Sequence, residues 1–275
     1  MVKRTDYTEI AVSAAKSVLI ELAHLLGEYR DDMVLIGGWV PELLLAGSSE
    51  RHVGSVDIDM ALNHLTLGEA GYANIGKLLL DKGYTQGSQP FIFFRSLQIE
   101  GREYKVQVDL LAGEYGGTGE KHRTQRIQDV KARKARGCDI AFKSFTEIKI
   151  EGKLPDGAID NATIRVASIV PFLVMKGMAL HDRIKEKDAW DVYYCLRNYP
   201  GGLDKVFDEL YDFLDSSLVK EGMEKLADKF SSPDHLGPKM VADFEEGTDW
   251  EARQFLQRDA YERVHYLIER IRVHG

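Results

Sequence analysis

The sequence predicts an α/β fold of the α+β kind, in which a mixed sheet flanked by helices (residues 1–165) precedes a helical C-terminal half (residues 166–275). Two observations predict the first part: short apolar runs alternate with polar residues at a period of two, and segments with helical spacing stand between them. The second part is predicted by apolar residues that recur at helical spacing from Ser168 onward. We expect the two parts to be separate domains.

The first half is expected to begin with a helix over residues 8–26. Thr8 can cap this helix, apolar residues recur through it at helical spacing, and Gly27 can end it. Apolar runs with a period of two predict the strands, and Glu100-Gly101-Arg102 between two of them indicates a hairpin. The strands expected here are 33–36, 56–61, 91–99, 103–111, 145–150 and 163–167, and the further helices are 39–46 and 67–82.

The second half is expected to consist of helices separated by turns that contain Gly and Pro, at 200–202 and 231–238. Earlier in the chain, segment 113–137 is glycine-rich and then basic, and no element is predicted in it. The helices expected in the second half are 168–181, 188–198, 203–214, 217–230 and 250–273.

The composition is typical of a soluble globular protein, with 44% hydrophobic and 29% charged residues. No run of about 18 apolar residues is present, so no contact with a membrane is expected. Cys138 and Cys195 form no CxxC pair and none of the histidines has a zinc-binding spacing, which argues against a zinc site or a disulfide framework. The two cysteines fit a reducing cytoplasm, which is the expected location.

The net charge of −8 argues against attraction of nucleic acid to the whole surface. Residues 121–136 differ from the rest of the chain, because seven Lys or Arg stand there against one acid, Asp129. A local basic segment of this kind can bind RNA or a triphosphate. The alternative interpretation is a solvated charged helix.

Two of the expected strands carry acidic residues at alternate positions. Asp57 and Asp59 point to the same face of strand 56–61, while Ile58 between them points to the other face. Asp109 is placed in the same way on strand 103–111. If the strands are neighbours, the three carboxylates meet, and their oxygens suit Mg²⁺ or Mn²⁺. Taken alone, the DxD pattern is also typical of surface acids at the end of a strand.

Gly37-Gly38 follows strand 33–36 and precedes a helix. Glycine allows backbone N–H groups to approach a ligand closely, and the N-terminus of a helix attracts phosphate. The residues that follow match neither a Walker A loop nor GxGxxG, so an NAD site is not indicated. The alternative interpretation is an ordinary turn.

The order of these motifs resembles a known family. The chain reads GG and a helix, then DIDM, then VQVDLL, and finally a helix with Lys176 followed by RIKEKDAWD, over about residues 30–200. This order is similar to that of the nucleotidyltransferase superfamily of the DNA polymerase β type. It is most similar to the AbiEii toxins of abortive-infection and type IV toxin–antitoxin systems, which pair a nucleotidyltransferase domain with a helical C-terminal half. About the last seventy residues resemble nothing that we could match.

The resemblance implies roles for residues that match the family's motifs. Asp57, Asp59 and Asp109 are expected to be catalytic and to bind the metal, and Asp188 is expected to be a further catalytic residue. The expected nucleotide-binding residues are Gly37, Gly38, Ser55, Lys176, Arg183, Lys187 and Asp191. Two features depart from the family: Gly38 stands where many relatives have serine, and 18 residues separate Gly38 from Asp57, more than in compact members. Neither departure removes a metal ligand.

The basic and acidic residues after Lys176 suggest how a triphosphate could be bound. On a continuous helix, Arg183 and Lys187 would each lie within about 20° of Lys176, and the three would form a positive stripe that faces the carboxylates. Asp188 and Asp191 would share a helical face and could act as a general base or orient Lys187. The alternative interpretation is a solvated face with paired charges.

These observations predict an Mg²⁺-dependent nucleotidyltransferase that moves NMP from an NTP to a hydroxyl group. The resemblance implies RNA as the acceptor, with the tRNA 3′ end as a candidate, growth arrest as the outcome, and a cognate antitoxin encoded nearby as a candidate partner. One alternative is a small-molecule nucleotidyltransferase that modifies an antibiotic. The other is a non-catalytic NTP-binding regulator, against which the presence of all three carboxylates argues.

Overall fold

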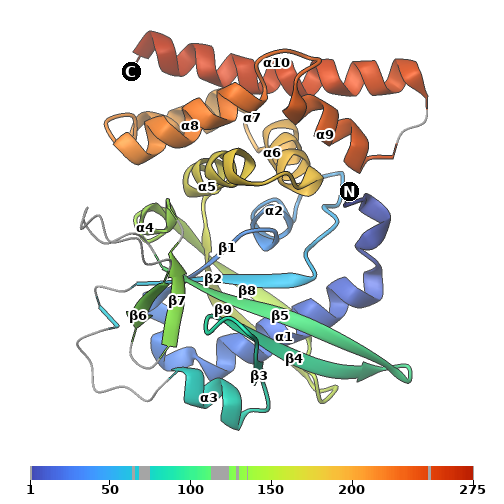
Figure 1. The fold of residues 1–275 in the computed structure, drawn as a ribbon, viewed down its shortest axis with the longest axis vertical. Helices are drawn as coiled ribbons and strands as arrows, with labels where there is room; N and C mark the ends of the chain where they lie inside the picture. The colour runs from blue at the N-terminus through green and yellow to red at the C-terminus, as the bar shows by residue number, and fades with distance from the viewer. Residues whose placement is uncertain are drawn as a thin grey trace. The chain divides into compact units, whose positions relative to one another are not determined.

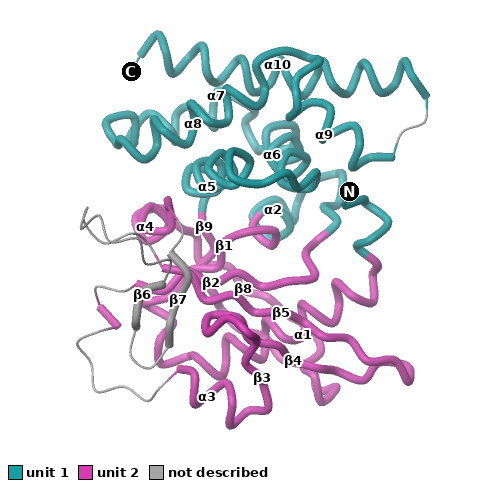
Figure 2. The backbone as a smooth tube through the Cα atoms, in the orientation of Figure 1, with its two compact units in different colours: residues 1–7, 41–53, 168–275 teal, residues 8–40, 54–167 magenta. Residues whose placement is uncertain are grey.

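The structure is a computed structural model that describes residues 2–63, 66–67, 75–112, 124–127, 130–134, 136–246 and 249–274, with the backbone alone for 124–127 and 130–134. It confirms the predicted class, a mixed sheet with flanking helices and a helical C-terminal part (Figure 1). The chain groups into two compact units (Figure 2). Residues 8–40 and 54–167 form the sheet unit, and residues 1–7, 41–53 and 168–275 form the helical unit. The functional division expected at residue 165 stays a prediction.

One mixed sheet forms the centre of the sheet unit, with its strands in the order β3-β4-β5-β2-β1-β9-β8. Strand β2 runs parallel to β5 on one side and antiparallel to β1 on the other, and β1 runs parallel to β9. Strand β7 pairs with the end of β5 and with β6. The strands are β1 Met33–Ile36, β2 Asp57–Leu62, β3 Thr85–Gln86, β4 Ile92–Ile99, β5 Arg102–Ala112, β6 Thr124–Ile127, β7 Val130–Lys134, β8 Phe145–Lys153 and β9 Ile159–Ala167.

Helix α1 (Glu9–Leu25) packs on strands of this sheet, including β8, β9, β5 and β2. Thr8 caps the helix as predicted, because the backbone N–H of Ala11 donates to Thr8 Oγ1 at 3.3 Å. The strand side chains that face the core are buried, as Ile58 and Val108 show. The remaining helices of the first 167 residues are η1 Arg4–Asp6, η2 Gly27–Asp32, α2 Trp39–Leu44, α3 Ile75–Asp81 and α4 Cys138–Ala141.

The helical unit contains a close approach of two helices and one helix that was not predicted. A Cβ atom on Gly177 of α5 would lie 2.1 Å from the carbonyl oxygen of Gly222 of α8, so the two backbones come together where side chains are missing. Helix α9 lies in a stretch that Gly and Pro appeared to interrupt, and Pro238 is tolerated because it stands in the first turn. None of the described helices is long and apolar enough to cross a membrane. The helices after residue 167 are α5 Ile169–Asp182, α6 Glu186–Asn198, α7 Gly202–Tyr211, α8 Ser217–Lys229, α9 Leu236–Phe244 and α10 Trp250–His274.

Candidate active site

Three acidic residues lie on two neighbouring strands of the sheet unit. Strands β2 and β5 are paired in parallel register, with Asp59 opposite Asp109 and Asp57 opposite Gln107. Residues opposite one another in paired strands project from the same face of the sheet. Ile58 lies between the two acids of β2 and is fully buried on the other face. The expected neighbourhood of the two strands is therefore confirmed, whereas the catalytic and metal-binding roles stay predictions.

Two of these carboxylates are held by nearby polar side chains. Ser55 Oγ donates to Asp57 Oδ1 at 2.5 Å, and Gln107 Nε2 donates to Asp109 Oδ1 at 2.8 Å. Each donor stands two residues before the carboxylate that it contacts. Ser55, which was predicted to bind nucleotide, thus orients an acidic residue directly, and Gln107 has the same role on the neighbouring strand.

The glycine turn lies against the acidic residues. Ile36, the last residue of β1, pairs with Asp59, so Gly37 begins the turn beside that residue. Gly37 has a φ of +74°, and a Cβ atom there would lie 2.1 Å from Asp59 Oδ2. Only glycine satisfies both the backbone conformation and the available space. Gly38 completes the turn before α2, so the predicted turn is present.

The acidic residues suit a hard divalent cation in their chemistry, because carboxylate oxygens are the ligands that Mg²⁺ and Mn²⁺ prefer. Adjacent strands are about 4.8 Å apart, so the register brings Asp59 and Asp109 within reach of a shared ion. In the part of the chain that the structure describes, however, no three His, Cys, Asp or Glu side chains converge as a metal site. The residues therefore fit a metal ion in type and strand position.

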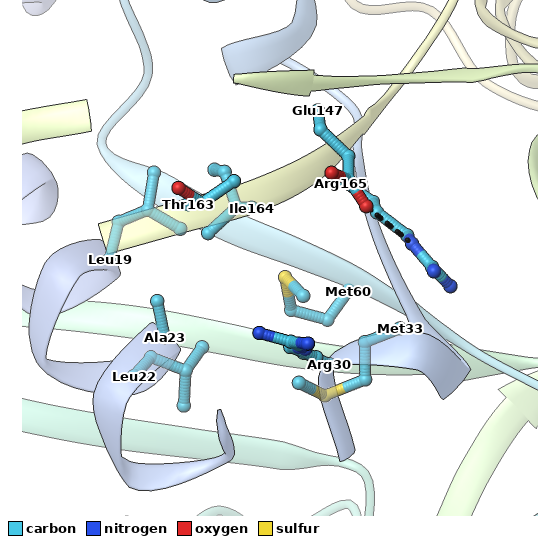
Figure 3. Close-up of a pocket in the computed structure, with 10 residues that line it drawn as sticks. All are labelled: Leu19, Leu22, Ala23, Arg30, Met33, Met60, Glu147, Thr163, Ile164 and Arg165. Carbon is cyan, nitrogen blue, oxygen red and sulfur yellow. Dashed lines mark hydrogen bonds and ion pairs between the residues drawn. The ribbon is translucent and has the colours of Figure 1, made fainter. Parts of the chain in front are cut away.

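A separate cavity of about 120 Å³ opens on the other face of the sheet (Figure 3). Met60 alternates with Asp59 along β2 and therefore lines this cavity, together with Met33 of β1. Leu19 and Leu22 of α1 line it from the helix side. The cavity is thus a gap in the packing of α1 against the sheet and does not belong to the acidic face.

The second group of predicted residues forms a buried ion cluster in the helical unit. Lys176 Nζ donates to Asp188 Oδ1 at 2.6 Å and to Asp191 Oδ2 at 2.7 Å. Lys187 Nζ donates to Asp191 Oδ1 and Oδ2 at 2.8 and 3.1 Å. Arg183 Nε donates to Asp188 Oδ2 at 2.9 Å. The structure therefore brings together all five charged residues that were predicted in this part of the chain.

The predicted break between helices 168–181 and 188–198 is confirmed, so the three cations do not form a stripe along one continuous helix. Helix α5 ends at Asp182, Arg183 is extended with φ −144° and ψ 158°, and α6 begins at Glu186. The alternative of a solvated face also fails, because Lys187 and Asp191 are 2% and 0% exposed. Lys176 and Lys187 instead meet the same carboxylate from two different helices.

Burial opposes the charges of Lys176, Asp188 and Asp191, and pairing reverses its effect on their pKa values. Desolvation would lower the pKa of Lys176, but the carboxylates of Asp188 and Asp191 hold it above its usual value. Desolvation would likewise raise the pKa of both carboxyl groups. Lys176 and Arg183 instead lower the pKa of Asp188, and Lys176 and Lys187 hold that of Asp191 well below its usual range. Lys176, Asp188 and Asp191 are therefore charged at neutral pH.

His52 completes the cluster, and no sequence pattern pointed to it. Its Nε2 lies 2.9 Å from Asp191 Oδ1, and its ring contacts Trp190 and Tyr194 at centroid distances of 5.0 and 4.9 Å. Burial, followed by the charge of Lys187, lowers the pKa of His52 to about 4. The histidine and its partner are 139 residues apart in the sequence, so a search for local metal-binding spacings cannot detect the pair.

A mixed sheet with acidic residues on adjacent strands and a glycine turn beside them is the arrangement expected of a nucleotidyltransferase. A family model described as "Nucleotidyl transferase AbiEii toxin, Type IV TA system" matches residues 22–262. The chain therefore belongs to the AbiEii family of nucleotidyl transferase toxins, as its motifs predicted. The match also includes most of the C-terminal helices, which resembled nothing from their sequence. No curated protein and no solved structure matches the chain.

Proposed function

We propose that the chain transfers NMP from an NTP to a hydroxyl group of RNA in an Mg²⁺-dependent reaction that releases pyrophosphate, with Mn²⁺ as a substitute ion. Membership of the family supplies the class of reaction, which is nucleotidyl transfer. The observation that carries the proposal is the parallel register that sets Asp59 beside Asp109, with Asp57 on the same face. Carboxylates grouped on adjacent strands repel one another, and a bound cation relieves this repulsion.

The three acidic residues would hold the metal ions. When bound, such ions lower the pKa of the attacking hydroxyl and neutralise the charge that develops on pyrophosphate. In the reaction the acceptor oxygen would bond to the α-phosphorus, the bond from the α-phosphorus to the bridging oxygen would break so that pyrophosphate leaves with that oxygen, and the hydroxyl proton would pass to water. Ser55 and Gln107 would keep Asp57 and Asp109 oriented through their hydrogen bonds. Gly37 would keep the space beside Asp59 free of any side chain.

The ion cluster of the helical unit would bind the phosphates of the nucleotide. Lys176, Arg183 and Lys187 bring three cationic side chains to Asp188 and Asp191, and cationic side chains of this kind bind phosphate oxygens. Asp188 and Asp191 are buried and fully engaged with these cations. We therefore assign positioning roles to both residues, in place of the direct catalytic role expected for Asp188.

The basic segment 121–136 supports RNA as the acceptor. Lys121 and Arg123 lie outside the described residues, but the backbone of β6 and β7 is extended, so the predicted alternative of a charged helix does not apply there. The register pairs Leu111 with Arg133 and Ala112 with Lys134. Strand β7 of this segment therefore pairs with β5, the strand that carries Asp109. The pairing begins at Leu111, two residues after Asp109. As a member of a toxin family, the chain would arrest growth by this modification, and a cognate antitoxin would oppose it.

The direct test incubates the protein with total tRNA, Mg²⁺ and each NTP labelled at the α-phosphate. We expect the wild-type protein to label RNA at the 3′ end, and Asp59→Ala to leave the RNA unlabelled while keeping the wild-type circular dichroism spectrum. Labelling by Asp59→Ala at the wild-type rate would refute the site. Labelling of an aminoglycoside in place of RNA would favour the antibiotic-modifying alternative. Thermal stabilisation by an NTP without release of pyrophosphate would favour the regulator.

A further inference from the structure

We propose that His52 is a positioning residue for nucleotide binding, which acts as a neutral hydrogen-bond donor that fixes Asp191 and, through it, Lys176. This role depends on the proposed function, because it takes Lys176 as a phosphate-binding group. His52 does not touch the nucleotide in this proposal. Its effect passes through the carboxylate that it shares with two lysines.

The hydrogen bonds of Asp191 define the form of the histidine. Asp191 Oδ1 accepts from Lys187 and His52, at 2.8 and 2.9 Å, and Oδ2 accepts from Lys176 and Lys187, at 2.7 and 3.1 Å. A carboxylate only accepts hydrogen bonds, so the proton of the imidazole must be on Nε2. Each oxygen of Asp191 thus receives two donors, which fixes the plane of the carboxylate.

The charge of the surroundings explains why the third donor is neutral. Lys176 of α5 and Lys187 of α6 already bring two positive charges to Asp191. A protonated His52 would add another in a side chain with no exposed surface. Neutral imidazole supplies the hydrogen bond without that charge, and the pKa of about 4 agrees with this form at neutral pH.

Lys176 needs such support because its remaining proton must point in one direction. Two of its ammonium protons go to Asp188 and Asp191, and the third has no acceptor among the described residues. That proton can meet a phosphate oxygen only while Nζ stays in place. Without the His52 donor, Asp191 could rotate toward Lys187, which contacts both of its oxygens, and Lys176 would move with it.

His52 is itself rigidly held. Its ring packs against Trp190 and Tyr194 of α6. Tyr194 Oη donates to the backbone oxygen of Glu50 at 2.6 Å, which fixes the segment two residues before the histidine. The donor therefore comes from a segment that is tied to the same helix as Asp191. This arrangement suits a residue that orients its neighbour.

Two substitutions of His52 distinguish the effect of its N–H donor from the effect of its aromatic ring. His52→Gln keeps an N–H group at a similar reach, whereas His52→Phe keeps an aromatic ring and removes the donor. We expect His52→Phe to raise the KM for the NTP by about tenfold or more, the effect of losing a buried hydrogen bond to a charged group. The value of kcat should change less, and His52→Gln should restore the KM to within about threefold of wild type. Calorimetric NTP binding should follow the same order.

A wild-type KM and NTP affinity in His52→Phe would overturn the role. Equal impairment of both variants would also overturn it, because ring packing rather than the N–H group would then matter. If His52→Phe does not fold, ¹⁵N–¹H correlation spectra of the wild-type protein decide: a neutral Nε2–H ring at neutral pH supports the role, and a charged ring or the other tautomer refutes it. If the wild-type protein transfers no nucleotide, the proposed function fails, whereas NTP binding by the variants still tests His52.

Discussion

Gly37 packs so closely against Asp59 that residue 37 has no room for a side chain. A Cβ atom on Gly37 would lie 2.1 Å from Oδ2 of Asp59. The backbone of Gly37 is also left-handed, with φ +74°, which other residues adopt only at a cost. The turn and the acidic strand therefore depend on each other. This relationship connects two motifs that the sequence shows only as separate patterns.

Substitution Gly37→Ala should move the Asp59 carboxylate away from its place on β2. A displacement of about 1 Å at a reacting group can lower the rate on the order of a hundredfold, so we expect at least that loss of nucleotidyl transfer. The left-handed backbone should also cost about 1 kcal/mol of stability. Gly27→Ala is the matched control, since nothing lies within 4 Å of its added Cβ and its φ is not in the left-handed region. Equal transfer rates in the two variants would contradict the required contact.

Substitution Asp109→Asn should abolish transfer without lowering the melting temperature. The change removes one of the three neighbouring negative charges, which relieves repulsion in the metal-free protein. Substitution of a residue that only supports a metal ligand typically lowers activity by roughly 10–100-fold. We expect a larger fall in rate for Asp109→Asn, because Asp109 is itself expected to bind the metal. Glu103→Gln is the control, because Glu103 lies on the same face of β5 but outside the stretch paired with β2. Retention of activity in the Asp109→Asn variant would remove Asp109 from the site.

Addition of Mg²⁺ should raise the melting temperature of the wild-type protein, and EDTA should reverse the change. An ion that binds only the folded protein stabilises it by about 2.7 kcal/mol at a hundred times its Kd. Asp59→Asn should lose this response, because the ion then loses a charged ligand. The comparison uses differential scanning fluorimetry at constant ionic strength. An unchanged Mg²⁺ response in Asp59→Asn would show that the ion binds elsewhere.

Several of these features could be predicted from the sequence because they have a local period. The alternation around Asp57 and Asp109 places each acid on the strand face opposite the buried side chains, and the structure has both strands at the expected positions. The register between the strands is set by long-range pairing and could only be assumed. The clash at Gly37 depends on an atom of Asp59, so the sequence indicates a turn there but not its reason.

The helical unit shows where local patterns fail. The break at Arg183 was predicted, but the sequence does not show that Arg183, in its extended segment, reaches back to Asp188. Contacts rather than periodicity place residues 41–53 with the helices, and His52 reaches Asp191 from that segment. Pro238 appeared to interrupt the chain, yet it stands in the first turn of α9. Each miss arises from a long-range contact or from the position of a residue within its element.

Substitution Gly177→Ala should destabilise the helical unit by about 1–3 kcal/mol or more, because the added methyl group meets the backbone oxygen of Gly222 at 2.1 Å. A backbone atom cannot rotate away as a side chain can, so α5 and α8 must separate. Lys176 is next to Gly177, and NTP binding should weaken together with stability. Gly47→Ala is the control, with open space around its Cβ. Urea unfolding measures the difference, and equal midpoints for the two variants would contradict the close approach.

Protonation of His52 should make the protein less stable as the pH falls from about 6.5 to about 4. The unfolded histidine takes up a proton near its ordinary pKa of 6.5, whereas the folded one resists until about pH 4. The unfolded state therefore binds more protons in this window, and stability is lost as the pH decreases. At about 1.4 kcal/mol per pKa unit, the loss by pH 4 is roughly 3 kcal/mol. Asp188 and Asp191 add to the loss at the acid end of this window, because their pKa values are lowered in the folded state while the unfolded carboxyl groups begin to take up protons near pH 5. Urea unfolding at several pH values should show this slope in the wild-type protein and a shallower one in His52→Gln, which cannot be protonated. Parallel slopes would mean that another group causes the loss of stability in acid.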